Sequence, residues 1–218
     1  MSRSEYVYLH GFASSPLSRK AQFFRQKLAG RGVEMAIPDL AEGDFGSLTV
    51  TSQLAVVDRV AASTGVTLFG SSLGGYLAAL FAARHPERVS RLILMAPAFR
   101  LAERWEARIG AEATRSWEAT GAMNYFHYGE KRDLALGWEF MADARRYEAY
   151  PVIPGRAVIF HGDGDEVVPL EDSLEIVARQ PEVRLQVMHS DHELGNCLEE
   201  MWQQTASFLF PGASRAVV

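Results

Sequence analysis

The most constraining feature of the sequence is the stretch Val66–Tyr76, VTLFGSSLGGY. A short run of β-branched and aromatic residues ends in glycine and serine, and a helical pattern, YLAALFAARH, begins at once. This order predicts a strand, a tight turn and a helix, with Ser72 at the centre of the pattern G-x-S-x-G. Glycines suit both flanks of such a turn, because the turn strains the serine backbone and leaves little room for neighbouring side chains.

The predicted turn places a serine at the amino end of a helix. The helix that begins after Ser72 directs its unpaired N–H groups and the positive end of its dipole towards whatever the serine attacks. A serine hydroxyl is a weak nucleophile at neutral pH, so it needs a base, and the base needs a carboxylate that orients it. The turn therefore indicates a nucleophile only if the rest of the chain supplies both partners.

Composition and charge narrow the class of protein. The chain has 218 residues, of which 48% are hydrophobic and 22% charged, and these values are typical of one soluble globular domain. The net charge of −5 argues against a nucleic-acid partner, which would need a basic face. The sequence shows neither an apolar stretch long enough to span a bilayer nor a secretion signal, and the lone Cys197 excludes an internal disulfide. We expect a cytoplasmic protein without a membrane span, whose oligomeric state the sequence leaves open.

Apolar runs of strand length alternate with helical patterns along most of the chain. The apolar runs lie at Tyr6–Leu9, Glu34–Ile37, Val66–Phe69, Arg91–Met95, Arg156–Phe160 and Val183–Met188. Nearly continuous runs such as RLILM and AVIF suit strands that are buried on both faces of a parallel sheet. The helical patterns lie at Ser18–Gly30, Thr49–Ser63, Leu77–Arg84, Leu170–Arg179 and Gly195–Leu209. This alternation predicts a doubly wound α/β fold with right-handed crossovers.

The alternation stops between Ala98 and Pro154. This interval shows helical periodicity but no convincing strand, and it contains three of the four tryptophans. We interpret residues 98–154 as a mostly helical lid, inserted between two parts of one α/β core, residues 1–97 and 155–218. For most of its aromatic residues, packing within the insertion is the simpler interpretation. An insertion this apolar must still dock on a surface, and the carboxyl ends of the strands are the open one.

A candidate acid follows the strand Arg156–Phe160. In this fold, the acid and then the histidine should lie in loops at the carboxyl ends of later strands. The loop HGDGDEVVP offers two acids, Asp163 and Asp165. We favour Asp165, because the Val-Val-Pro segment behind it can pack down and fix it. Asp163 lies in a Gly-Asp-Gly turn, where aspartate is a common turn residue.

Two candidate bases follow the strand Val183–Met188, in the sequence HSDH. His189 comes directly after the strand, whereas His192 is carried out on the loop before the last helix. We favour His192 as the base and interpret His189 as a loop or supporting residue. His127, in the insertion, is a weaker candidate for a pocket residue.

An acyl-transfer site also needs backbone N–H donors aimed at the oxygen that becomes negative. Leu73, the first helical residue after the serine, supplies one donor. The second should come from the loop after the first strand, and we expect it to be the N–H of Phe12, because Gly11 allows a close backbone approach. We expect the side chain of His10 to brace this loop.

Other ligand classes find little support. Arg19 and Lys20 are possible contacts for an anion, but charges on a solvated helix face are the simpler interpretation. His161, Asp163 and Asp165 follow one strand too closely to enclose a metal ion, and no HxxxH or CxxC spacing supports them. We expect neither a metal nor a cofactor.

The segments HGFASSP, GSSLGGY, HGDGDEVVP and DH, in this order and spacing, resemble the α/β-hydrolase superfamily. The opening YLHGFASSPLSRKAQFFRQKLAGRG is similar to small YqiA-type esterases and related serine thioesterases, and the resemblance covers essentially the whole chain. The chain begins at what would be the family's third strand. The resemblance therefore implies a mostly parallel sheet of about six strands. The family's functional residues fall as follows: nucleophile Ser72, acid Asp165, base His192, oxyanion donors Phe12 and Leu73.

The resemblance implies a serine hydrolase that cleaves a carboxylic ester or thioester of a small apolar acyl group. A peptidase or amidase of the same fold is the alternative. A non-catalytic ligand-binding protein is less favoured, because such proteins usually lack a member of the triad and this sequence has all three. The acyl chain length and the choice between ester and thioester stay open.

Overall fold

A computed structural model describes residues 4–211, so residues 1–3 and 212–218, the outer ends of the predicted core, lie outside the described residues. The framework is a parallel five-stranded sheet with the strand order β1-β2-β3-β6-β7. Its strands are β1 (Tyr6–Leu9), β2 (Val66–Ser71), β3 (Val89–Met95), β6 (Arg156–Gly162) and β7 (Arg184–Met188). Strands that follow one another along the chain are joined by crossovers, so all carboxyl ends meet on one side of the sheet.

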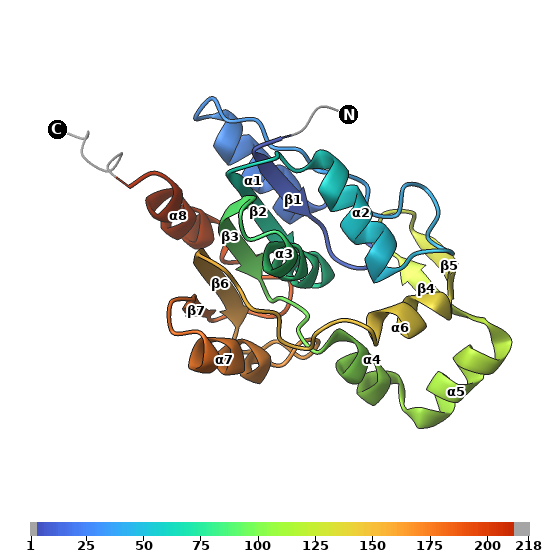
Figure 1. The fold of residues 1–218 in the computed structure, drawn as a ribbon. Coiled ribbons are helices and arrows are strands. Elements are labelled where there is room, and N and C mark those ends of the chain that lie inside the picture. Colours follow the sequence, from blue (N-terminus) through green and yellow to red (C-terminus); the bar gives the residue numbers. More distant parts are fainter. Residues whose placement is uncertain (1–3, 212–218) are drawn as a thin grey trace.

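Helices cover both faces of this sheet (Figure 1). One face carries α2 (Val50–Val60), α3 (Leu73–Arg84) and α7 (Leu170–Arg179), and the other carries α1 (Arg19–Ala29) and α8 (Leu198–Leu209). Successive side chains of a strand point to opposite faces. In β3, Leu92 and Leu94 therefore join the core under α3, while Ile93 and Met95 join the core under α1 and α8. This explains why the strands read as continuous apolar runs rather than alternating ones.

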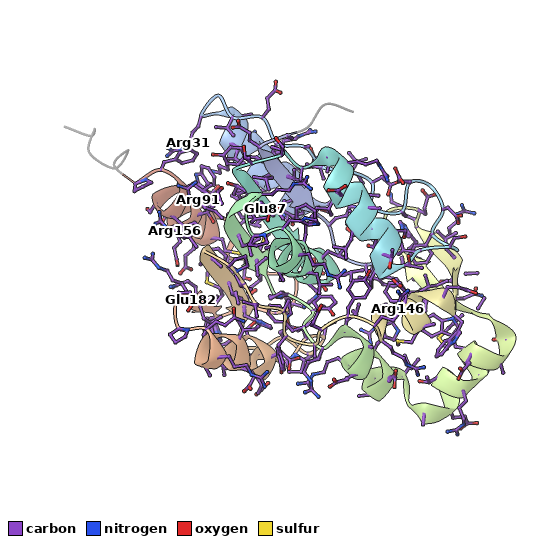
Figure 2. The ribbon with its side chains drawn as sticks, in the orientation of Figure 1. Arg31, Glu87, Arg91, Arg146, Arg156 and Glu182 are labelled. Atoms are coloured by element: carbon purple, nitrogen blue, oxygen red, sulfur yellow. The ribbon has the colours of Figure 1, made fainter. Side chains whose placement is uncertain are left out.

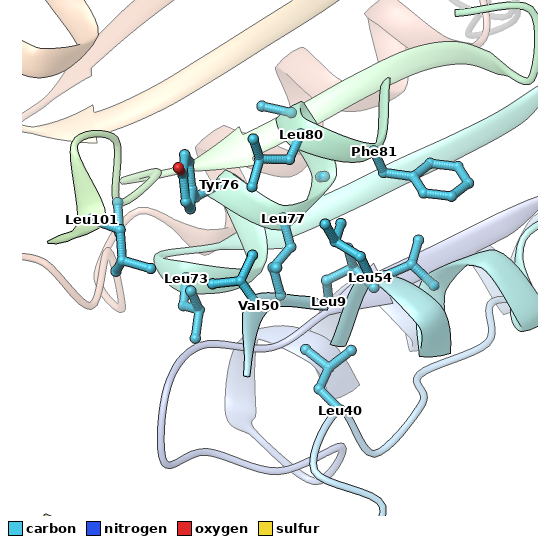
Figure 3. Close-up of a cluster of buried hydrophobic side chains, with 14 of the residues drawn as sticks. Leu9, Leu40, Val50, Leu54, Leu73, Tyr76, Leu77, Leu80, Phe81 and Leu101 are labelled. Carbon is cyan, nitrogen blue, oxygen red and sulfur yellow. The ribbon is translucent and has the colours of Figure 1, made fainter. Parts of the chain in front are cut away.

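The helix α3 is buried on almost every side. Its residues from Leu73 to Ala82 are all buried, which is typical of a central helix rather than a surface one. Figure 3 shows leucine and valine side chains of α2 and α3 gathered with Leu9 of β1 and Leu40. Burying each large aliphatic side chain contributes roughly 1.5–3 kcal/mol. The amino end of α3, where Ser72 lies, is therefore held firmly against the sheet.

One predicted strand, Glu34–Ile37, shrinks to a single bridge between Ala36 and Val7. Tyr8 N–H donates to the Ala36 carbonyl at 2.8 Å, and Ala36 N–H donates to the Tyr6 carbonyl at 2.9 Å. The next N–H in this register would belong to residue 38, which is a proline and has none. The pairing ends there, and the sheet has five strands rather than about six.

The segment between β3 and β6 is mostly helical, as predicted, but it also contains a hairpin, so the expectation that it has no strand is wrong. Its elements are α4 (Leu101–Ile109), α5 (Ala111–Thr120), β4 (Ala122–His127), β5 (Arg132–Gly137) and α6 (Glu139–Ala144). They gather at one end of the molecule (Figure 1). In β4, Met123, Tyr125 and His127 are more buried than Asn124 and Phe126, which is the two-residue period of a strand. Adjacent aromatic residues on its two faces obscured this period in the sequence.

Two buried carboxylates fasten the segment 98–154 to the rest of the chain. Asp172 of α7 accepts two hydrogen bonds from Arg104 of α4, both 2.8 Å, and one from the Tyr150 hydroxyl at 2.9 Å. Asp143 of α6 accepts from the N–H and the hydroxyl of Thr51 in α2, both at 2.8 Å. A buried carboxylate without such partners is strongly unfavourable, so these bonds hold the segment in one position.

The backbone packs most tightly at Gly74, and this contact leads to a prediction about stability. A Cβ on Gly74 would lie 2.1 Å from the Leu9 carbonyl oxygen, a backbone atom fixed in β1. We expect Gly74→Ala to lower the free energy of unfolding by more than about 2 kcal/mol, measured by urea denaturation.

Gly30→Ala is the matched control for this prediction. Gly30 ends α1 at a φ of −62°, and a Cβ there would meet its nearest atom at 3.6 Å. We expect this substitution to change the unfolding free energy by less than about 1 kcal/mol. Equal stabilities of the two variants would contradict the prediction.

Candidate active site

The turn after β2 holds Ser72 in a strained backbone conformation. Its φ is 53° and its ψ is −118°, a combination that residues with side chains rarely adopt. Ser72 N–H donates to the Met95 carbonyl at 2.9 Å, and Ala98 N–H donates to the Ser72 carbonyl at 3.1 Å. A Cβ on Gly70 would lie 2.3 Å from the Gly74 carbonyl oxygen, so close packing requires these glycines, as predicted. Neighbouring strands thus keep the serine in its strained geometry.

The loop that carries Phe12 passes beside Ser72, and Leu73 follows Ser72 directly in the chain. A Cβ on Gly11 would be 3.5 Å from the Cβ of Ser72, so the loop after β1 passes beside the serine. Within residues 4–211, the N–H groups of Phe12 and Leu73 donate no hydrogen bond. Leu73 is the first residue of α3, where an N–H has no acceptor within the helix. The structure therefore brings two uncommitted N–H donors to the serine turn.

His10 braces the loop after β1, which confirms its predicted role. Its Nε2 accepts a hydrogen bond from Leu40 N–H at 3.3 Å, and its Nδ1 lies 3.0 Å from the Gly11 carbonyl oxygen. Because an accepting Nε2 carries no proton, Nδ1 carries it and donates to that carbonyl. Burial lowers the pKa of the His10 imidazole despite the bond to Gly11, which favours this neutral form.

The candidate acid and base are hydrogen-bonded to each other. His192 Nδ1 lies 2.7 Å from Asp165 Oδ2, and the Asp165 side chain is fully buried. The other carboxylate oxygen accepts the N–H groups of Val167 and Val168, both at 2.8 Å. Burial alone raises the pKa of Asp165, but hydrogen bonds from His161, His192 and Val168 outweigh it and hold this pKa well below its usual range. An ionised Asp165 keeps the proton of His192 on Nδ1 and leaves Nε2 free to act as a base.

The alternative acid and histidine also pair, but at the surface. His189 Nδ1 lies 3.1 Å from Asp163 Oδ2, and the His189 side chain is 99% exposed. Asp163 Oδ1 accepts a further bond from Ser190 N–H at 3.3 Å. The bond between the two side chains lowers the pKa of Asp163 and raises that of His189. Of these two pairs, the one we favoured from the sequence is the buried one.

The loop that carries His192 runs from the carboxyl end of β7 to helix α1. It leaves β7, which is one edge strand, and Glu193 reaches α1, the helix that follows the opposite edge strand β1. There the Lys20 ammonium donates to the Glu193 carbonyl at 2.8 Å. The serine turn follows β2 and this loop follows β7, so both lie at the carboxyl ends of the parallel strands. Within residues 4–211, the Ser72 hydroxyl and His192 Nε2 make no hydrogen bond, and such bonds are often formed only when substrate binds.

Lys20 is buried, contrary to our interpretation of it as a solvated charge. It is 9% exposed, and its ammonium also lies 3.4 Å from a carboxylate oxygen of Glu193. Burial lowers the pKa of this ammonium, although the charge of Glu193 opposes the effect. Lys20 is thus a contact of the His192 loop rather than a free cation at the surface.

The ring of Phe12 lies within a cluster of aromatic side chains. It contacts the rings of Phe45, Trp105, Tyr125 and Phe140, with centroids 4.6–5.8 Å apart. Trp105 Nε1 donates to the Tyr125 hydroxyl at 2.8 Å, which satisfies the polar atoms of both rings. The segment 98–154 therefore packs directly on the loop that carries one predicted oxyanion donor.

His127, the weaker candidate, lies within this packing. Its ring stands edge-on to Phe45, with centroids 5.0 Å apart, and its Nδ1 accepts the N–H of Glu130 at 3.1 Å. Phe126 and Tyr128, close to it in sequence, are exposed. Most other aromatic residues of the segment are buried or half-buried, in agreement with a packing role.

Several arginines lie at the opposite ends of the strands. Arg91 and Arg156 pair in register near the amino ends of β3 and β6, and Figure 2 shows them with Arg31 on the side of α8. Arg31 lies over the Trp202 ring at 5.6 Å, and Arg156 lies over the Phe208 ring at 5.2 Å. These cations are therefore remote from the serine turn.

Sequence reasoning missed one contact of the candidate acid. We considered His161 only as a metal ligand, yet its Nε2 lies 3.2 Å from Asp165 Oδ2. Within residues 4–211, no group of three His, Cys, Asp or Glu side chains is arranged to hold a metal ion, and no helix is both long and apolar enough to cross a bilayer. The sequence places His161 at the start of the loop that carries Asp165. That position predicts that the two residues are near each other, but it does not predict that they are in contact.

The buried Asp165 predicts a pH dependence of stability. Its pKa is lower in the folded than in the unfolded chain, so its bonds stabilise the protein above about pH 4. This contribution is lost as the pH falls through the lower, folded pKa. We expect the difference in unfolding free energy between the wild type and Asp165→Asn, measured by urea denaturation, to shrink steadily below about pH 4. A difference that stays constant with pH would contradict this, and the exposed Asp163→Asn provides the control.

Comparisons with known proteins agree with this architecture. The sequence matches the family model of UPF0227, described as an uncharacterised protein family, over residues 5–209. A search of the curated proteins found no significant match. Among solved structures, α/β hydrolase domain-containing protein 10 from mouse is 22% identical with a TM-score of 0.78, covering 94% of this chain and 88% of that one. Est1E from Butyrivibrio proteoclasticus is 22% identical with a TM-score of 0.74, covering 96% and 88%. The chain therefore has the α/β-hydrolase fold, which confirms the fold class and the resemblance drawn from the sequence.

Proposed function

Since the chain belongs to the UPF0227 family and has the α/β-hydrolase fold, we propose that it is a serine hydrolase with Ser72 as its nucleophile. One observation carries the proposal. A strained serine follows β2 beside the loop of Phe12, and the hydrogen-bonded Asp165 and His192 lie in the loops after β6 and β7, at the same carboxyl ends of the parallel sheet. We propose a carboxylic ester or a thioester as the substrate.

In the first step, Ser72 Oγ attacks the carbonyl carbon while His192 Nε2 takes its proton. The electron pair of the carbonyl bond moves to the oxygen, and the N–H groups of Phe12 and Leu73 stabilise the negative charge. Removal of one such donor typically costs ~3 kcal/mol of transition-state stabilisation. The carbonyl bond then re-forms, and the alcohol or thiol leaves with the proton from His192. The acyl group remains on Ser72.

Water completes the cycle by the same route. His192 takes a proton from the water, whose oxygen attacks the acyl carbon, and Ser72 leaves with that proton as the acid is released. Asp165 stays ionised throughout and stabilises the imidazolium of His192. Its lowered pKa and its fully buried position support this role.

We propose that the acyl group is small and apolar, and that residues 98–154 form a lid over it. The Phe12 ring, whose backbone would hold the oxyanion, packs against Trp105 and Tyr125 of that segment. An acyl group at the oxyanion would thus lie near aromatic side chains, while the arginines described above are remote. One structure of Est1E from Butyrivibrio proteoclasticus, 21% identical to this chain, contains bound ferulic acid, a carboxylic acid with an aromatic ring.

Labelling with a fluorophosphonate tests the nucleophile. We expect one adduct on the wild type, read by intact mass, and none on Ser72→Ala, whose kcat/KM for p-nitrophenyl esters should fall by roughly 10⁴-fold or more. Ser71→Ala, the neighbouring serine, is the matched control and should label like the wild type. An adduct on Ser72→Ala, or none on folded wild type, would contradict the proposal. A series of esters, acyl thioesters and amides then separates an esterase from a peptidase or amidase.

The two acid–histidine pairs offer a second test of the site. We expect Asp165→Asn and His192→Gln each to lower kcat/KM by roughly 10³–10⁴-fold, because the base loses its orientation or disappears. Asp163→Asn and His189→Gln remove the exposed pair and should change kcat/KM less than about threefold. Steady-state kinetics on the four variants measure this, with circular dichroism to check folding. A larger loss in the exposed pair would reverse our assignment.

A further inference from the structure

His161 is a fully buried imidazole that the proposed mechanism does not use. It lies near the carboxyl end of β6, and its Nε2 is 3.2 Å from Asp165 Oδ2 and 2.9 Å from the Val168 carbonyl oxygen. Its Nδ1 is 2.7 Å from the hydroxyl of Ser173 in α7, which is also fully buried. The ring thus joins the proposed catalytic acid to a helix of the core.

The partners of His161 determine where its proton lies. Nε2 faces the Val168 carbonyl and the Asp165 carboxylate, and neither oxygen can donate. Nε2 must therefore carry the proton and share it between them. The Ser173 hydroxyl can donate to Nδ1, so both ring nitrogens have partners when Nε2 alone carries a proton. In that form the ring directs an N–H towards Asp165 and adds no charge beside it.

We propose that His161, held by Ser173, is a positioning residue for the acid Asp165, an inference that rests on the proposed function. Asp165 Oδ2 accepts from His192 Nδ1 at 2.7 Å and lies 3.2 Å from His161 Nε2, and Oδ1 accepts two backbone N–H groups at 2.8 Å. Three hydrogen bonds and the contact with His161 thus limit rotation of the carboxylate. Oδ2 therefore stays directed at His192. In other proteins, too, residues that hydrogen-bond a catalytic or metal-binding side chain fix its orientation.

The helix that carries Ser173 is itself well fixed. The preceding residue, Asp172, is 1% exposed and binds Arg104 and Tyr150 of the segment 98–154. Ile176, one turn further along α7, is fully buried in the core. Because α7 is fixed, Ser173 does not move with the His161 ring and can hold this ring at a defined distance from Asp165.

Removal of the His161 donor should change the behaviour of the base as well as the rate. Without this bond, Oδ2 interacts more strongly with the imidazolium of His192, while the carboxylate is less well oriented. We expect His161→Leu to lower kcat/KM for a p-nitrophenyl ester about tenfold and to move the acid limb of the pH–rate profile to higher pH. His161→Gln keeps an N–H donor and should restore most of both. Ser173→Ala should show a smaller change in the same direction.

Proton NMR gives a readout that does not depend on turnover. The Nδ1–H resonance of His192, assigned by its loss in His192→Gln, should shift in His161→Leu and stay near its wild-type position in His161→Gln. An unchanged resonance and pH profile in His161→Leu would overturn the proposal, and so would equal losses in the leucine and glutamine variants. If circular dichroism shows that His161→Leu does not fold, Ser173→Ala carries the test with the same two readouts.

These outcomes separate the positioning role from the proposed function. If Ser72 is not labelled and no ester or thioester is hydrolysed, the proposed function fails. His161 then cannot be said to position a catalytic acid. The His192 resonance then shows whether the contact alone exists. If Ser72 is labelled and substrates are hydrolysed, but the resonance and pH profile agree in all variants, only the positioning role fails.

Discussion

The contact between Gly74 and the backbone of β1 is the constraint on which the rest of the structure depends. Because no side chain intervenes, the amino end of α3 lies directly on the Leu9 carbonyl and fixes β2, the serine turn and the loop after β1 relative to one another. The strain at Ser72 persists because packed backbone surrounds it, and not because of any interaction of its own side chain. The same packing brings the N–H groups of Phe12 and Leu73 close to the serine.

Buried charge is the second organising element. Asp165 and Asp172 are both removed from water, and each is surrounded by donors from several parts of the chain. Such groups are costly unless fully hydrogen-bonded, so each one selects a single arrangement of the segments that supply its donors. Asp172 thereby fixes the segment 98–154 on α7, and Asp165 fixes the acid loop and the His192 loop. The buried ammonium of Lys20 acts in the same way on Glu193.

Short sequence patterns predicted the strands and helices whose bounds depend on neighbouring residues in the chain. The bounds of β1 and α7 agree with the predicted Tyr6–Leu9 and Leu170–Arg179, because continuous apolar runs and a proline before a helix are sequence-local signals. The hairpin was missed because Tyr125 and Phe126 are both aromatic on opposite faces. The contacts of Lys20 and His161 were missed for another reason. They depend on which distant loop covers a side chain, and spacing along the chain carries no such information.

Two carboxylate contacts, described above, join the segment 98–154 to the helices of the core. None of Ser72, Asp165 and His192 belongs to it, although its Ala98 N–H donates to the Ser72 carbonyl. It is joined to the core helices by Arg104 on Asp172 and by Asp143 on Thr51. For protein engineering, a replacement segment would have to keep an arginine at Asp172, a carboxylate at Thr51 and aromatic packing on Phe12. Such a replacement would leave Ser72, Asp165 and His192 themselves unchanged.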